Sequence, residues 1–537
     1  MNEFALVTTP DCREDGTDDA TEDGSRTGIL VSMCLALVLV VASVASVNLA
    51  LTGISVDLGT TSSQLTWIAD GYTVALAALV LPFGALGDLL GRRTLLLIGT
   101  IVFGSAALTA SFAQSAGMLI GCRVVMGIGA AMVMPGTLST ITAVFPASKR
   151  SRAVSVWAGF ASSGAILGML TCGTILEWWS WRATFVFTAI LAVVTFGAVL
   201  VLAPNTSDPK EAVIDVPGYA LSAVGVGALI FGIIEGAEAG WTATNTLIGL
   251  GIAMVALGAF VFWELHTERP MLDVRLFALP GFSTGTLALT VQFLCLFGFF
   301  FVGLQFLQLM LGYSALHSAL CLMPLGAIVM PMSRVAPHLV DRFGQRAVMS
   351  AGLAGLGVGL AVLAQMDADS SYWHFLAGLV VVGIGMALTS TPSTTAIVTS
   401  LPRAKQGVGS AVNDVSRELG SALGIAILGS LFSSGYSKAI GTATDALPPE
   451  AAHVVQESAG GALAVASRLG PDGEALATSV RNAFSEGLSD ALWVGAAIAV
   501  LTAMYTIWRA PARSSVGADD DLEPMAAEPN TPTLVSA

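Results

Sequence analysis

Residues 84–93 read GALGDLLGRR and join two long apolar runs. The glycines, the single acid and the paired arginines predict a tight, charged turn between two membrane helices. A weaker copy, DRFGQR, occupies residues 341–346 between two further apolar runs. The two turns align Asp88, Gly91 and Arg93 with Asp341, Gly344 and Arg346. An internal repeat of a charged hairpin predicts a secondary transporter built from two related halves.

The composition is that of an integral membrane protein. Of 537 residues, 54% are hydrophobic and 11% are charged, whereas soluble domains carry about 25% charged residues. The formal net charge of −14 arises mainly from acidic runs in the terminal segments 1–27 and 511–537. We predict that both segments are disordered, solvated tails, with partner binding as the alternative. The chain has no basic stripe interleaved with aromatic residues, which argues against a nucleic-acid ligand.

Cysteine and nucleotide motifs point to no cofactor. The six cysteines show no CxxC spacing, and five of them lie in apolar runs. They predict small buried side chains, with neither disulfides nor a metal site. No GxxxxGK[ST] loop is present, so ATP is not expected to drive transport. The polar, acidic start lacks the basic region of a cleavable signal peptide, so the first helix should remain as an anchor.

Apolar runs of about 20 residues, the length that spans a bilayer, occur fourteen times. They are centred on residues 28–51, 67–87, 94–113, 118–144, 153–176, 182–203, 217–235, 245–264, 282–310, 316–338, 347–366, 373–399, 407–434 and 488–508. The sequence therefore predicts an all-α membrane protein with fourteen transmembrane helices.

Basic residues predict the orientation of these helices. The loops after even-numbered runs carry Arg92, Lys149 and Arg342 among others, whereas short loops after odd-numbered runs carry almost none. The positive-inside rule then places both termini in the cytoplasm of a multi-pass cell-membrane protein. Residues 435–487 form the one sizeable outside loop, whose Ala-rich stretches could be short surface helices.

The repeat also predicts how the helices are grouped. The two charged turns follow the second and tenth runs, so the halves are offset by eight helices. We expect an N-terminal six-helix bundle over 28–204, an inserted helix pair over 215–264, and a C-terminal six-helix bundle over 281–510.

Several motifs in this order resemble the major facilitator superfamily, and within it the fourteen-helix drug:proton antiporters of the QacA/EmrB type. The turn at 84–93 is similar to the superfamily's cytoplasmic signature loop, and Arg123 with the downstream Gly127 and Pro135 to its helix-4 arginine motif. DVPG at 215–218 resembles the start of the inserted pair of this branch. The resemblance implies two pseudo-symmetric bundles around a central cavity and proton-driven export of drugs.

The resemblance also implies a conformational latch at the two charged turns. Glycines allow tight turns, and the acid and arginines can bond neighbouring helix ends in one conformational state only. The predicted latch residues are Gly84, Gly87, Asp88, Gly91, Arg92 and Arg93 in the first turn, and Asp341, Arg342, Gly344 and Arg346 in the second.

Two motifs depart from the family pattern. The exporter motif of the fifth helix is reduced to GMLTCG at 168–173, so that only Gly164, Gly168 and Gly173 keep its small-residue character. In the first helix Asn48 keeps its place in an Asn-x-Ala-Leu motif, but Ser43 stands where relatives carry an acid. The reduced motif weakens the argument for antiport, and an acid that would attract cationic drugs is absent.

Charged residues at bilayer depth cost about 2.5–3.5 kcal/mol each on insertion scales and need a reason to be there. Asp70, one turn inside Trp67, is either a substrate or proton site or an interfacial acid in contact with water. The resemblance implies that Arg123 organises a proton relay; the alternative is a structural arginine bonded to helix ends.

The thirteenth run holds the densest set of intramembrane polar residues, at positions 413–418. Asp414 and Glu418 share one helix face, and Arg417 is within reach of Asp414. Desolvation and a neighbouring arginine shift a carboxylate's pKa in opposite directions, so the site could load and release a proton. A static salt bridge is the alternative.

The ninth run combines three glutamines, Gln292, Gln305 and Gln308, with neighbouring phenylalanines. This combination suits a cavity for bulky amphipathic molecules or, alternatively, a lipid-facing surface.

The preferred function is proton-coupled export of hydrophobic or amphipathic drugs by a monomer that contacts only substrate, protons and lipid. The alternative is export of a specific metabolite, lipid or siderophore. An integral-membrane enzyme or sensor would need clustered metal ligands, a nucleophile with its base, or a folded output domain, which the sequence lacks.

Overall fold

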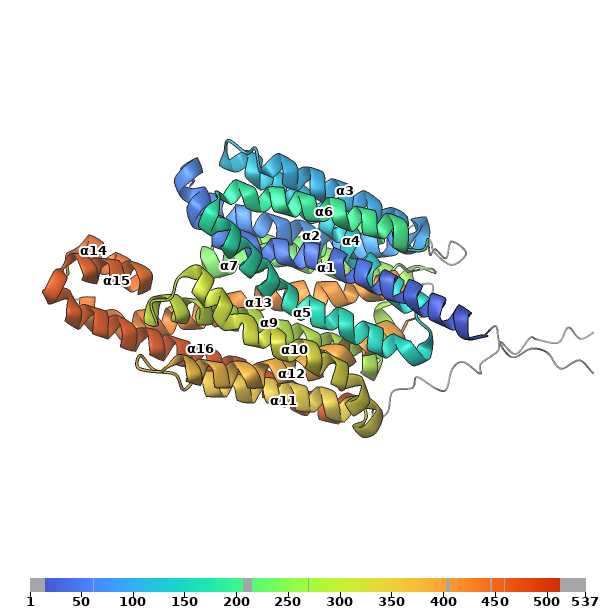
Figure 1. Ribbon diagram of the computed structural model, residues 1–537. Coiled ribbons are helices and arrows are strands. Elements are labelled where there is room, and N and C mark those ends of the chain that lie inside the picture. The colour runs from blue at the N-terminus through green and yellow to red at the C-terminus, as the bar shows by residue number, and fades with distance from the viewer. Residues whose placement is uncertain are drawn as a thin grey trace, which may run out of the picture.

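A computed structural model describes residues 15–60, 62–205, 215–268, 270–401, 406–444, 447–457 and 459–511. Within these residues the chain is entirely helical and contains no strand. The long helices run roughly side by side in one elongated bundle (Figure 1). Fourteen of them are long and apolar enough to span a membrane, which confirms the predicted number.

Six helices make up the N-terminal group, and two more form the inserted pair. The N-terminal group consists of α1 (Asp15–Leu58), α2 (Ser62–Leu90), α3 (Arg92–Ala110), α4 (Ala116–Val144), α5 (Ala147–Trp178) and α6 (Trp181–Leu202). The inserted pair consists of α7 (Val216–Glu238) and α8 (Thr244–His266).

The C-terminal group contains the remaining six spanning helices. These are α9 (Pro280–Gln305), α10 (Ala315–Phe343), α11 (Gln345–Leu363), α12 (Tyr372–Thr399), α13 (Gln406–Ile440) and α16 (Glu474–Arg509). Shorter elements connect them: the 3-10 helix η1 (Val274–Ala278), the π-helical turn η2 (Phe306–Met310), η4 (Gly441–Thr444), α14 (Pro449–Glu457), α15 (Ala459–Arg468) and η5 (Gly470–Gly473).

Two element boundaries differ from the sequence prediction. Helix α1 begins at Asp15, so residues 15–27 of the predicted disordered tail are helical. The sequence is rich in acidic residues at the start of this stretch, and acidic residues are favoured near helix N-termini. The segment between the spanning helices is also shorter than the predicted outside loop 435–487, because α13 continues to Ile440 and α16 starts at Glu474. The rest of the predicted tails, 1–14 and 512–537, lies outside the described residues.

The bundle has two distinct ends. The end where α1 begins and α16 finishes, called here the terminal end, carries the turns between α2 and α3 and between α10 and α11. At the opposite, far end α14 and α15 project beyond the spanning helices (Figure 1). Val455, Ala459 and Ala462 anchor these two short helices to α13 and α16 in one hydrophobic core cluster.

Each helix group has its own hydrophobic core. Met33, Phe103 and Trp157 belong to a cluster formed almost entirely by α1–α6, whereas Phe299 and Phe375 belong to one formed mainly by the C-terminal group. The architecture is therefore two six-helix bundles and an inserted helix pair, as the repeat predicts.

Candidate functional site: a charged seam between the two helix groups

The charged turn at 84–93 is shorter in the structure than its sequence suggests. Helix α2 ends at Leu90 and α3 begins at Arg92, so Gly91 alone links them. Gly91 has a φ of 99° and its counterpart Gly344, between α10 and α11, has a φ of 84°. Residues with a Cβ rarely adopt this conformation. The aligned glycines therefore make the same one-residue turn in both groups.

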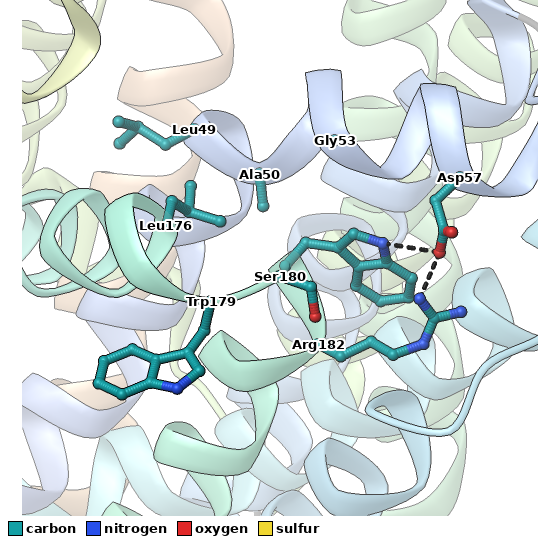
Figure 2. A pocket seen from close by; sticks show the side chains of 9 residues that line it. Leu49, Ala50, Gly53, Asp57, Leu176, Trp179, Ser180 and Arg182 are labelled. Atoms are coloured by element: carbon teal, nitrogen blue, oxygen red, sulfur yellow. Dashed lines mark hydrogen bonds and ion pairs between the residues drawn. The ribbon is translucent and has the colours of Figure 1, made fainter.

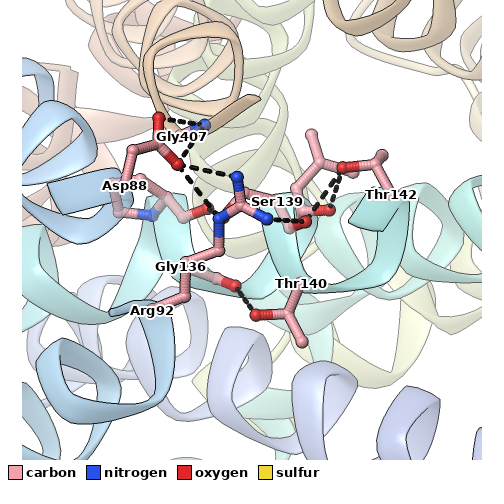
Figure 3. Close-up of polar contacts among 9 residues, drawn as sticks. Asp88, Arg92, Gly136, Ser139, Thr140, Thr142 and Gly407 are labelled. Carbon is pink, nitrogen blue, oxygen red and sulfur yellow. Dashed lines mark hydrogen bonds and ion pairs between the residues drawn. The ribbon is translucent and has the colours of Figure 1, made fainter. Parts of the chain in front are cut away.

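Asp88 connects the two groups at the terminal end. Its side chain is buried, and both carboxylate oxygens accept hydrogen bonds from the backbone N–H of Gly407, at 2.8 and 3.1 Å. Gly407 lies in the first turn of α13, so the carboxylate faces the positive end of that helix (Figure 3). The predicted latch acid thus joins α2 of the N-terminal group to α13 of the C-terminal group.

Arg92 completes this contact. Its Nε and Nη2 donate to Asp88 Oδ1 at 3.0 and 2.8 Å, and its Nη1 donates to the carbonyl of Ser139 in α4 at 3.3 Å (Figure 3). Both side chains of the ion pair are about 95% buried, so the pair is shielded from water. Such charge-assisted bonds are stronger than neutral hydrogen bonds. Arg93 turns away and donates to the carbonyl of Leu200 in α6.

The backbones of α2 and α13 approach each other closely beside the contact between Asp88 and Gly407. A Cβ at Gly84 would lie 2.6 Å from the Cβ of Ala411 and 2.7 Å from the carbonyl oxygen of Gly407. Any larger residue at position 84 would therefore push α2 away from α13. The Gly87 carbonyl accepts a hydrogen bond from the N–H of Gly91 and closes the end of α2.

The second charged turn is arranged differently. Asp341 and Arg342 are exposed, and Arg342 lies over the ring of Phe343 at 5.3 Å. Arg346 is half-buried in α11. The second turn therefore repeats the backbone geometry of the first. Its acid, Asp341, is exposed, whereas Asp88 is buried against the facing helix group.

Arg123 is fully buried in α4 and bonds α2. Its Nε donates to the carbonyl of Ile68 at 2.9 Å and its Nη2 to that of Ala69 at 3.3 Å. The guanidinium also lies 4.5 Å from the ring centroid of Tyr72 and within electrostatic range of Asp70. Both alternatives for Arg123 retain support, because it bonds helix carbonyls and also neighbours an acid.

The polar set on α13 lies in the core. Asn413 and Asp414 are completely buried, Arg417 is 4% exposed and Glu418 is half-buried. Arg417 Nη1 lies 3.7 Å from Asp414 Oδ1, so the i, i+3 pair forms. The hydroxyl of Thr394 in α12 donates to Asn413 Oδ1 at 3.0 Å.

Glu418 links the polar residues of α13 to the N-terminal group. It lies within electrostatic range of Tyr72 in α2, whose ring in turn contacts Arg123. Charged and polar groups therefore extend from Asp414 through Arg417 and Glu418 to the other helix group, and this set is called here the charged seam. No sequence pattern marks Tyr72 as a member of this set, because a lone tyrosine in an apolar run is normally part of the core.

The candidate residues of α9 are not gathered in one place. Gln292 is completely buried, and neither end of its amide has a hydrogen-bond partner among the described residues. A buried amide in this state needs water or a ligand. Gln305 lies 13 residues further along the helix, roughly 20 Å away, and donates to the carbonyl of Phe301. Phe299 and Phe306 pack on Phe375 of α12, which places them in the protein core.

The small residues of α5 serve helix packing. A Cβ at Gly168 would lie 2.5 Å from Cα and O of Ala42, and one at Gly164 would lie 3.3 Å from Val41. Both glycines therefore allow α5 to approach α1. Gly173 faces Leu316 of α10 at 3.1 Å, across the seam between the groups. Asn48 lies in α1, but its side chain is outside the described part of the structure.

A set of polar contacts, called here the strap, ties α1 to α6 at the far end of the N-terminal group (Figure 2). Asp57 of α1 accepts hydrogen bonds from Trp181 Nε1 at 3.1 Å and from Arg182 of α6. Arg182 also donates to the carbonyl of Ala113 at 3.1 Å and thus ties in the α3–α4 loop. A cavity of about 400 Å³ lies beside the strap, between the ends of α1 and α5 and the start of α6.

The Asp57 strap predicts a pH dependence of stability. Hydrogen bonds from Arg182, and then from Trp181, hold the pKa of Asp57 below its ordinary value. The strap therefore stabilises the fold above the unfolded-state pKa of about 3.9, and this contribution disappears as the pH falls through the folded-state pKa. Asp57→Asn should lower the melting temperature by a few degrees at pH 7, and the difference from the wild type should close below about pH 4. Asp369→Asn, at another exposed far-end acid, is the control; a pH-independent difference for Asp57→Asn would contradict the assignment.

The fold and this charged seam define an integral-membrane transporter of two related halves. A family model described as the Major Facilitator Superfamily matches residues 33–425, and the chain belongs to that superfamily. The human organic anion transporter MFSD10 has a similar structure, with a TM-score of 0.61 and 12% identity over 90% of this chain and 99% of that one.

Two bacterial relatives are similar over almost their whole length. The multidrug efflux pump LfrA of Mycolicibacterium smegmatis is 33% identical over 91% of this chain and 97% of its own. The methyl viologen resistance protein SmvA of Salmonella typhimurium is 31% identical over 88% of this chain and 96% of its own. With the fourteen spans, these relatives confirm the resemblance to the fourteen-helix branch.

Proposed function

We propose that the chain exports hydrophobic or amphipathic drugs across the cell membrane and that inward proton flow drives this export. The observation that carries the proposal is the nearly full-length similarity to a multidrug efflux pump and to a methyl viologen resistance protein. The charged seam supports the proton part, because it places two carboxylates and an arginine where two moving bundles meet. Neither a metal nor an organic cofactor has a role in this mechanism.

The proposed cycle uses alternating access. Asp88 and Arg92 hold α2 against α13 and keep the terminal end closed. Opening of that end breaks the hydrogen bonds between Asp88 and Gly407 and separates the groups. Asp414 and Glu418 take up a proton when water reaches them from one side and release it when access changes sides. Gln292, with its unpartnered amide, is the proposed polar contact for substrate.

Accumulation of ethidium in an efflux-deficient bacterial host tests this function. Cells that express the chain should accumulate several-fold less ethidium than cells with an empty vector, and a protonophore should abolish the difference. An unchanged accumulation of ethidium and of methyl viologen would refute drug export. Export that persists in the presence of the protonophore would refute proton coupling alone.

We also propose that the protein is a monomer with both termini in the cytoplasm, so that the terminal end faces inward. The five cysteines within the described residues are buried, which favours labelling at introduced sites. In a Cys12→Ser background, Gln114→Cys and Asp369→Cys should react with an impermeant maleimide on whole cells. Glu268→Cys should react only after permeabilisation, since it follows the eighth span. All three positions are exposed, so reaction of Glu268→Cys on intact cells would invert the topology.

A further inference from the structure

Trp157 of α5 is the largest completely enclosed side chain in the described part of the protein and lies at the seam between the helix groups. Its indole Nε1 donates to the hydroxyl of Thr137 in α4 at 3.0 Å. That hydroxyl donates in turn to the carbonyl of Met134 at 2.8 Å, so Thr137 is fixed and accepts the indole N–H. The hydrogen bond that orients the Trp157 ring therefore comes from the N-terminal group.

Arg417 of α13 meets this ring from the other helix group. Its Cζ lies 5.6 Å from the indole of Trp157 and 4.8 Å from the ring of Phe293 in α9. Its Nη2 donates to the carbonyl of Ala161, one turn beyond Trp157 on α5, at 3.4 Å. Its Nη1 lies 3.7 Å from Asp414. The guanidinium thus contacts an acid of its own helix, Asp414, and two residues of the opposite group, Trp157 and Ala161.

The buried guanidinium depends on these few contacts. Its Nε has no hydrogen-bond partner among the described residues, and the side chain is about 95% buried. A buried cation with few hydrogen bonds relies on aromatic faces and on a nearby opposite charge. The charges that act on Arg417 are those of Asp414 and Glu418 on its own helix. From α5 and α9 it meets a carbonyl and two rings, while Tyr72 of α2 faces Glu418.

We infer that Trp157 is a positioning residue that couples the charges of α13 to the N-terminal helix group. A proton on Asp414 removes the charge that draws Arg417 back, so the guanidinium stays against Trp157 and Ala161 and holds α13 to α5. Loss of that proton draws Arg417 toward Asp414 and weakens its hold on α5. The inference rests on the proposed proton-coupled export and names how the proton would act on the seam between the groups.

Export of ethidium by proteoliposomes tests the role of Trp157. Trp157→Leu removes the aromatic face, so uphill export driven by a pH gradient should fall about tenfold, whereas downhill ethidium exchange stays within about twofold. The pH of half-maximal export should fall by about one unit, because Arg417 without the ring lies closer to the carboxylates of Asp414 and Glu418 and favours their ionised forms. Trp157→Phe, which keeps a ring face, should restore most of the export. Thr137→Val, which removes the acceptor that orients the indole, should give an intermediate loss.

Phe484→Leu is the matched control, since Phe484 is an equally buried aromatic residue of α16 that packs on Phe432, away from the charged seam. It should lower uphill and downhill transport together and leave the pH profile unchanged. The same parallel loss for Trp157→Leu would overturn the inference and make Trp157 a packing residue. Unchanged coupling in Trp157→Leu would overturn it as well. A wild-type protein without protonophore-sensitive export would refute the proposed function, whatever the variants do.

Discussion

Glu418→Gln should reduce uphill ethidium export driven by a pH gradient to the background of empty liposomes, while downhill exchange of ethidium persists. The substitution keeps the size and polarity of the side chain but removes its ability to exchange a proton. Glu418 is half-buried on α13, one turn from Asp414 and within range of Tyr72 on the opposite group. With Ser43 in place of an acid in α1, few intramembrane carboxylates remain to carry the proton. Parallel measurement of pH-driven and downhill transport in proteoliposomes checks this result.

Two further substitutions separate the candidate acids. Asp414→Asn should give the same loss as Glu418→Gln if the two carboxylates act as one site. Asp70→Asn should instead alter the preference among cationic substrates, because Asp70 lies near the far end of α2, which the proposed topology places outside. If Glu418→Gln and Asp414→Asn both keep uphill, protonophore-sensitive export, the α13 set is a structural salt bridge. Coupling would then pass to Asp70.

Asp88→Asn should slow transport by roughly 10- to 100-fold and leave the affinity for ethidium within a few-fold. The substitution leaves Arg92 buried without its counter-charge, and breaking such a pair by removing one partner costs about 2–5 kcal/mol. It also weakens the interaction with the positive end of α13. The contact lies at the terminal end, outside the proposed substrate site. Transport rate and equilibrium binding in the same preparation measure the two effects separately.

Asp341→Asn provides the matched control for the latch. Asp341 aligns with Asp88 and follows the same type of turn, but its side chain is exposed. Transport by this variant should stay within about twofold of the wild type, as is usual for surface substitutions. A loss of ethidium affinity with normal turnover in Asp88→Asn would place the first charged turn in the binding site. Equal losses in both variants would point to a role shared by the two turns.

Local features of the fold were predictable from the sequence, and contacts between distant helices were not. Gly91 and Gly344 indicate turns because glycine permits a positive φ that other residues rarely adopt. This signal is contained in a short stretch of sequence. The ion pair of Asp414 and Arg417 follows from helix geometry alone. These two predictions needed no knowledge of tertiary packing.

The partners across the seam depend on how the two groups dock. Asp88 and Gly407 are 319 positions apart, and Gly407 contributes only a backbone N–H, which any residue except proline has. The bond from Arg417 to Ala161 likewise ends on a carbonyl 256 positions away. Trp157 looked like one more apolar residue, because its role comes from Thr137 and Arg417 on other helices. A contact that ends on a backbone N–H or carbonyl cannot be predicted from the type of residue that provides it.

The inserted helix α7 has a consequence for the route that lipid-soluble molecules can take. Val226, Ile230 and Ile233 of α7 form one hydrophobic cluster with Ala77 of α2 and Ala422 of α13. The helix therefore covers the outer side of the joint between the two groups, where the bilayer would otherwise touch it. α7 thus shields that joint from a molecule dissolved in the membrane, whereas within the described residues the inserted pair makes no comparable contact at the opposite joint, where α5 packs on α10. The two joints between the helix groups therefore differ in how far lipid can reach them.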